Sequence, residues 1–162
     1  MGTVIIEGLV ECFLLLIPCV VGIANGPVNM VFFYEKEVHE RVVANGLTTK
    51  EKIDKGLKRF KLYSIIPLIA FPLIAVYGIN GTVGFVDGFV QICTILVMMG
   101  LFDRLFIDWY WVGKTKAWVI EGTEDLQPYI YGKTLLGKWL FTIIGYPILA
   151  VILSAVITLF IR

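Results

Sequence analysis

The apolar positions of this chain are gathered into four long stretches separated by shorter polar segments. Each stretch has about 18 residues or more, which lets an α-helix cross the hydrocarbon core of a bilayer. Because a chain inside a bilayer must satisfy its backbone hydrogen bonds internally, such stretches are expected to be helical. The pattern predicts an all-α integral membrane protein, a single domain over residues 1–162 folded as a bundle of four transmembrane helices. The predicted spans are Leu9–Phe33, Leu62–Ile79, Val83–Ile107 and Leu135–Ile161.

Helix-breaking and capping residues mark the ends of the predicted helices. The sequence NGPVN at residues 25–29 interrupts the first stretch, because proline has no backbone N–H to donate. Either one kinked helix continues to about Ala44, or the span ends at the interruption and a second helix begins at Pro27. Thr48 followed by Glu51 has the spacing of a capping box. It predicts a basic helix along the cytoplasmic surface that leads into the second span.

Two of the connections between the predicted spans differ sharply in length. Asn80–Thr82 is so short that the second and third spans must be antiparallel neighbours. The segment from Trp109 to Lys133 is longer than a simple connection needs, and loops of this length are often functional. Its first half, residues 109–120, is either a small hairpin or a continuation of the third helix. The tryptophans predict an aromatic belt at the cytoplasmic interface, made of Trp109, Trp111, Trp118 and Trp139.

Basic residues are confined almost entirely to two regions of the chain. Residues 34–61 contain eight of the fourteen lysines and arginines, and residues 104–138 contain five, whereas the turn at 80–82 has none. Under the positive-inside rule, this distribution places both termini of a multi-pass protein outside the cytoplasm. A basic segment beside a membrane span predicts binding to anionic lipid headgroups and not to nucleic acid. With 58% hydrophobic residues and a mean hydropathy of +0.84, the composition excludes an ordinary soluble domain.

Polar residues inside the first and third stretches recur at helical spacing. The first stretch carries one polar stripe, made of Glu7, Glu11, Asn25 and Asn29. The third carries another, which includes Asp87 and Gln91. Because polar groups that face lipid are costly, both stripes are expected to face the bundle interior or a partner subunit. They are either hydrogen-bonding contacts between helices or the lining of an ion path, whose acids attract cations at its outer mouth. Asp87 is the most diagnostic of these acids.

A second set of candidate residues lies at the predicted cytoplasmic end. It consists of Glu35, His39, Asp103 and Asp108. Carboxylates with an imidazole can hold a divalent metal or transfer protons. The alternative interpretation is structural, because Arg104 and Asp108 have the i,i+4 spacing of a helical ion pair and the charges around Glu35 resemble a solvated face. The sequence identifies neither the metal nor a cofactor.

Three functions fit these patterns. The polar stripe favours a small transporter or channel-like protein for a cation or a small cationic solute, and four short spans would need a homo-oligomer to enclose its path. An integral-membrane enzyme acting on a lipid or another amphiphile would instead use the residues of the cytoplasmic face. A non-catalytic membrane subunit would use the stripes to contact partner helices. Neither GKT sequence, at 113–115 or 132–134, follows the glycine that a phosphate-binding loop requires.

Overall fold

The computed structural model describes residues 2–161, which form helices joined by turns and one longer loop, with no strand in that range. Four helices or continuous helical runs are long and apolar enough to cross a membrane. They are α1 (Gly2–Ala24), α3 (Lys50–Leu73) with η2 (Ile74–Ile79), α4 (Phe85–Phe102) with η3 (Asp103–Val112), and α5 (Gly132–Leu140) with η6 (Phe141–Gly145) and α6 (Tyr146–Ile161). The predicted all-helical chain with four candidate spans is therefore confirmed.

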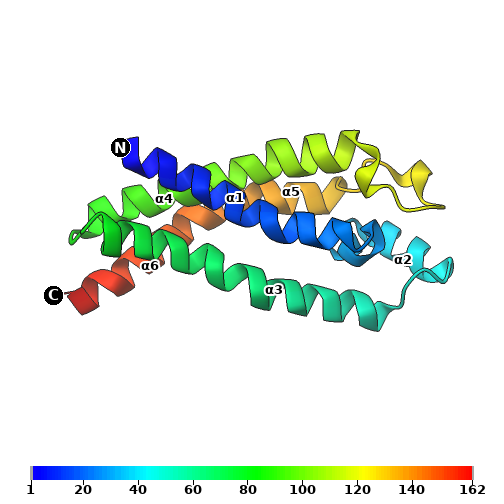
Figure 1. The fold of residues 1–162 in the computed structure, drawn as a ribbon, viewed down its shortest axis with the longest axis horizontal. Coiled ribbons are helices and arrows are strands. Elements are labelled where there is room, and N and C mark those ends of the chain that lie inside the picture. Colours follow the sequence, from blue (N-terminus) through cyan, green and yellow to red (C-terminus); the bar gives the residue numbers. More distant parts are fainter. Residues whose placement is uncertain (1, 162) are drawn as a thin grey trace.

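The long helices alternate in direction along one axis of the molecule (Figure 1). α1 and α4 lead away from the end that holds both termini, and α3 and the α5–α6 run lead back to it. The helix α2 (Lys36–Ala44) and the loop of residues 113–131 lie together at the opposite end, called here the loop end. α4 packs most extensively against α6 and α1. Its buried face supplies much of the core, with Gly88, Ile92, Ile95, Leu96, Met99 and Gly100.

The first predicted span is shorter than the sequence suggested. α1 ends at Ala24, and the separate 3-10 helix η1 (Pro27–Phe33) follows it. Gly26 has a φ of +98°, a backbone conformation that side chains with a Cβ rarely adopt, so the helix stops there. Pro27 then begins η1, where its missing N–H costs nothing. A single helix over residues 9–33 is therefore wrong, and the alternative of a break near Asn25 is confirmed.

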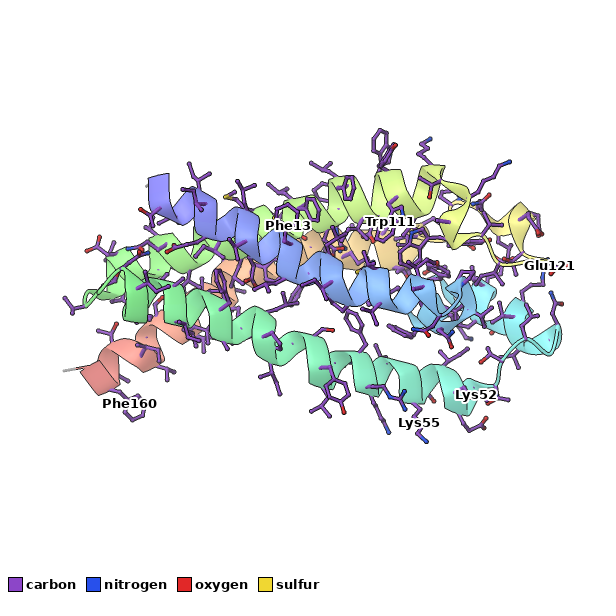
Figure 2. All side chains as sticks on the ribbon, in the orientation of Figure 1. Phe13, Lys52, Lys55, Trp111, Glu121 and Phe160 are labelled. Carbon is purple, nitrogen blue, oxygen red and sulfur yellow. The ribbon has the colours of Figure 1, made fainter. Side chains whose placement is uncertain are left out.

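The basic helix that leads into the second span is also present. α3 begins at Lys50, and the Thr49 hydroxyl accepts a hydrogen bond from the Lys52 amide at 3.3 Å. The cap therefore lies one residue after the predicted Thr48. Lys52 and Lys55 are both exposed on α3 (Figure 2), beside a surface pocket that η1 also lines. This leaves their charges free to meet a surface or solvent.

The long loop forms a small folded cap instead of a hairpin. The third helix continues through η3 to Val112, and the 3-10 helices η4 (Lys116–Trp118) and η5 (Glu124–Leu126) follow. Trp118 is only 1% exposed and packs edge-on against Trp111, with ring centroids 4.9 Å apart. The assignment of Trp118 to an interfacial belt is therefore wrong, whereas Trp109 is 63% exposed and fits that position.

Close packing of α4 against the α5–α6 run gives a testable prediction. A Cβ atom at Gly100 would lie 2.6 Å from the Tyr146 ring and 2.9 Å from the Thr142 methyl group, whereas a Cβ at Gly137 would meet nothing within 4 Å. Both glycines are helical, so alanine improves helix propensity equally at each. We expect Gly100→Ala to be less stable than Gly137→Ala by about 1 to 3 kcal/mol. Equal thermal unfolding of the two variants in detergent would contradict this packing.

Candidate functional site

Four charged side chains form a cluster near the loop end, between η3 and α5. Arg104 and Asp108 are at its centre, with side chains only 5% and 4% exposed. The Arg104 Nη1 and Asp108 Oδ2 atoms are 3.0 Å apart, and the Lys138 Nζ donates to Asp108 Oδ1 at 2.9 Å. Arg104 also donates to Asp103. The ion pair inferred from the Arg104–Asp108 spacing is thus present, but it is buried and belongs to a larger cluster.

Local helix geometry positions these charges. Asp103, Arg104 and Asp108 all lie in η3, which is π-helical, and Lys138 lies just before η6, which is also π-helical. A π-helix places more residues in each turn than an α-helix and is found frequently at functional sites. The opposite charges therefore meet between the π-helical η3 and the end of α5 that leads into η6.

A cavity of about 450 Å³ borders the cluster and is called here the outer cavity. Arg104, Asp108 and Lys114 give it a polar side. The Arg104 Nε atom is buried and has no hydrogen-bond partner among residues 2–161. Most of the remaining wall is apolar, with Leu105, Trp109, Pro128, Ile130, Leu135 and Trp139.

The polar side of the outer cavity favours a negative group. It contains two cations, Arg104 and Lys114, and one carboxylate, Asp108. The Lys114 ammonium lies 5.8 Å from the centre of the Trp109 ring, within range of a cation–π contact. An exposed lysine beside a buried guanidinium can approach an anion that enters the cavity. The arrangement therefore suits a ligand with an apolar body and an anionic end.

The loop is held against α2 by several polar contacts. The Glu35 amide donates to the Tyr129 carbonyl at 3.0 Å, and the Tyr131 hydroxyl donates to Glu37 Oε2 at 2.9 Å. This bond to a carboxylate raises the pKa of Tyr131, so its hydroxyl stays a donor at neutral pH. Arg41 and Asp125 are joined at 3.1 Å. These contacts fix Pro128 and Ile130, which form part of the cavity wall.

The four candidate residues that the sequence predicted at the cytoplasmic end do not form one site. Asp103 and Asp108 belong to the charge cluster, whereas Glu35 accepts a hydrogen bond from Thr134 beside α2. His39 lines a separate surface pocket between α2 and α3. Within the described part of the chain, no group of three or more His, Cys, Asp or Glu side chains could hold a metal ion. The interpretation of these residues as metal ligands therefore has no geometric support in that part of the chain.

The opposite end of the molecule holds a polar network that joins three helices. Asn80 Nδ2 lies 3.1 Å from Glu7 Oε2 and 2.9 Å from Gln91 Oε1. Gln91 Nε2 in turn donates to the Thr82 hydroxyl at 2.9 Å. Two of the predicted stripe residues, Glu7 and Gln91, are thus brought together by a residue of the tight turn. The helical spacing of polar residues could not identify Asn80, because this residue lies in the turn between the second and third apolar stretches.

The remaining stripe residues have different environments. Glu11 is completely buried, and neither carboxylate oxygen has a hydrogen-bond partner within residues 2–161. Asn25 and Asn29 lie beyond the end of α1 and are exposed. Asp87 is also exposed, in the first turn of α4, and no hydrogen bond joins it to the network around Glu7 in the described structure. The stripe on the first stretch is therefore interrupted by the break at Gly26.

No protein-family model matches this chain, and no curated protein or solved structure shows significant similarity to it. Function is therefore inferred from the side chains of the site.

Proposed function

We propose that this protein spans a membrane four times and binds an anionic amphiphile in the outer cavity. Four apolar helices of sufficient length support the first part of the proposal. The abundance of lysine and arginine near the loop end favours a cytoplasmic position for that end, with both termini on the other side. The outer cavity would then lie close to the cytoplasmic interface, where lipid headgroups are found.

One observation carries the binding proposal. The outer cavity joins an exposed apolar entrance to a buried guanidinium. Leu105 is 55% exposed and Trp109 is 63% exposed, so both would face lipid in a membrane. An amphiphile could therefore keep its chain in the bilayer while its head group reaches Arg104 and Lys114. No passage through an aqueous channel is needed.

The charges determine which head group is preferred. A phosphate or carboxylate accepts charge-assisted hydrogen bonds, which are roughly twice as strong as neutral ones. Arg104 is already shared with Asp103 and Asp108 and only its buried Nε is unpaired, so it contributes mainly positive charge at the wall of the cavity. Lys114 has no ion-pair partner among the described residues and contributes a full charge. A zwitterionic head group would bring its own cation towards Arg104 and Lys114, and it would therefore bind more weakly.

Selective lipid binding is the first test. Protein in a neutral detergent is mixed with equal amounts of phosphatidylglycerol and phosphatidylcholine, and retained lipid is counted by native mass spectrometry. We expect roughly tenfold preference for phosphatidylglycerol, equivalent to about 1.4 kcal/mol. Lys114→Gln should remove most of this preference. Lys55→Gln is the matched control, because Lys55 is exposed on α3 far from the cavity.

Two results would contradict the proposal. Equal loss of selectivity in Lys114→Gln and Lys55→Gln would mean that the basic surface as a whole attracts anionic lipid. Equally tight binding of free glycerol phosphate would mean that the apolar wall contributes nothing and that the ligand is not an amphiphile.

A second candidate function, cation transport, is favoured by Glu11 alone. Ionisable side chains inside a membrane segment are costly and mark ion or proton pathways. A carboxyl group without a hydrogen-bond partner can bind a proton or a cation when the helices around it move. Proteoliposomes should then show a cation or proton flux that Glu11→Gln abolishes and that Asp87→Asn, at an exposed position, leaves unchanged. No flux in the unmodified protein would exclude this function.

A further inference from the structure

A second and smaller cavity lies on the other side of Asp108 and is called here the inner cavity. Its volume is about 180 Å³. Side chains from α1, η1, α3, η3, the loop and the α5–α6 run line it, so it lies where several helices meet the loop. Its wall is mainly apolar, with residues such as Leu15, Phe60, Leu68, Ile107, Val112 and Ile130. It differs from the outer cavity because all of its lining residues except Ile65 are buried or half-buried.

Two residues that line the inner cavity each carry a hydrogen-bond donor with no acceptor. The Tyr34 hydroxyl and the Trp118 indole nitrogen are both buried and without a partner among residues 2–161. Tyr34 is 3% exposed and Trp118 is 1% exposed. A buried donor left unpaired costs about 1 to 3 kcal/mol, and proteins rarely keep one without a reason. Two such donors on residues that line one cavity favour a ligand that brings a hydrogen-bond acceptor.

Both donors are held rigidly by neighbouring aromatic rings. Tyr34 stacks on Tyr129 with ring centroids 4.8 Å apart, and Trp118 packs edge-on against Trp111 at 4.9 Å. Tyr129 is itself fixed, because its hydroxyl accepts a hydrogen bond from the Ile120 amide at 3.0 Å. Burial raises the pKa of Tyr34, so its hydroxyl remains a neutral donor. The donors are therefore preorganised for a ligand.

The charges around the inner cavity select against an anion. Asp103, Asp108 and Lys138 line it, which gives two carboxylates and one ammonium. The Lys138 ammonium is already bound to Asp108 and lies 5.3 Å from the centre of the Phe33 ring. Arg104 and Lys138 already pair these carboxylates, so no free cation is left to bind a carboxylate or phosphate. A neutral carbonyl oxygen needs only the two hydrogen-bond donors.

We propose that the inner cavity binds a neutral, ring-sized group that carries a carbonyl oxygen, held by the Tyr34 hydroxyl and the Trp118 N–H. The size agrees with this class, because a cavity of about 150 Å³ with an apolar wall accommodates a benzene ring. An aromatic ketone and a quinone ring both have this chemistry. The proposal does not depend on anionic amphiphile binding in the outer cavity.

Three fluorinated probes of similar size test the proposal by ligand-observed ¹⁹F NMR on the detergent-solubilised protein. They are 4-fluoroacetophenone, 1-ethyl-4-fluorobenzene and 4-fluorobenzoate, with protein-free micelles as the partition control. The ketone should bind saturably and roughly tenfold more tightly than the hydrocarbon, because only the ketone pairs the buried donors. The benzoate should bind more weakly than the ketone.

Tyr34→Phe is the decisive variant, because it removes one hydroxyl and keeps the ring. It should lower ketone affinity towards that of the hydrocarbon and leave hydrocarbon binding unchanged. Tyr63→Phe, at an exposed tyrosine of α3, is the matched control and should change neither. Lys114→Gln should also leave ketone binding intact, which separates this site from the outer cavity. Equal binding of ketone and hydrocarbon, an unaffected Tyr34→Phe, or no saturable binding because water alone fills the cavity would each overturn the proposal.

Discussion

Arg104→Met is expected to lower the free energy of unfolding by about 3 to 5 kcal/mol, the usual cost of removing one partner from a buried ion pair. Arg104 contacts both Asp103 and Asp108 and is 5% exposed, so its loss leaves two carboxylates with only Lys138 to balance them. Methionine keeps much of the side-chain volume, which limits the contribution of a new void. Thermal unfolding in detergent measures the change.

Two further variants show whether the loss of stability comes from the unpaired buried charge or from nonspecific disruption of the fold. Arg104→Met combined with Asp108→Leu should recover most of the lost stability, because one negative and one positive group then remain. Arg41→Met breaks the exposed pair with Asp125 and should cost about 0 to 1 kcal/mol. An Arg104→Met loss no greater than that of Arg41→Met would mean that the charge cluster is hydrated and contributes little.

Glu11→Met should raise the free energy of unfolding by about 1 to 3 kcal/mol, because it removes a buried carboxyl group whose oxygens are unpaired in the described structure. The same change should abolish any cation or proton flux, since methionine binds neither. Stability gained together with function lost is the expected signature of a functional residue. Thermal unfolding and proteoliposome flux measure the two effects on the same preparation.

Glu11→Gln is the matched control for the Glu11→Met variant. Glutamine has nearly the same shape but still buries polar atoms that lack partners, so it should bring little of the gain in stability. A clear loss of stability in Glu11→Met would contradict this account. It would show that the carboxyl group makes stabilising contacts when the protein is in detergent or membrane.

Hydropathy and capping residues were sufficient to predict the helices, because both are local properties of the chain. The spans follow from runs of apolar residues, and the tight turn at Asn80 requires α3 and α4 to be antiparallel. The start of α3 was misplaced by one residue, because Thr48 and Thr49 are both plausible caps. The break after Ala24 was one of two alternatives, because proline alone does not decide between a kink and an end. The positive φ of Gly26 decides between them, because it ends the helix.

The site itself depends on contacts between residues that are far apart in the chain. Asp108 and Lys138 are 30 residues apart in the chain, and the local sequence around neither residue predicts their contact. The burial of Trp118 was missed for a related reason, since the loop folds back onto α2 through contacts with Tyr129. The predicted polar stripe assumed one straight helix. Because the helix ends before Gly26, residues after this point no longer share a face with Glu7 and Glu11.

The most direct test of the outer cavity as an anionic-amphiphile site is photocrosslinking in a bilayer. A phosphatidylglycerol analogue with a diazirine near its glycerol group is activated in proteoliposomes, and labelled peptides are mapped by mass spectrometry. The account predicts labels concentrated on Leu105, Trp109, Leu135 and Trp139, reduced by Lys114→Gln and by replacing the probe with a phosphatidylcholine analogue. Labels spread in proportion to exposed apolar surface, or concentrated on the basic helix from Lys50 to Lys61, would contradict it.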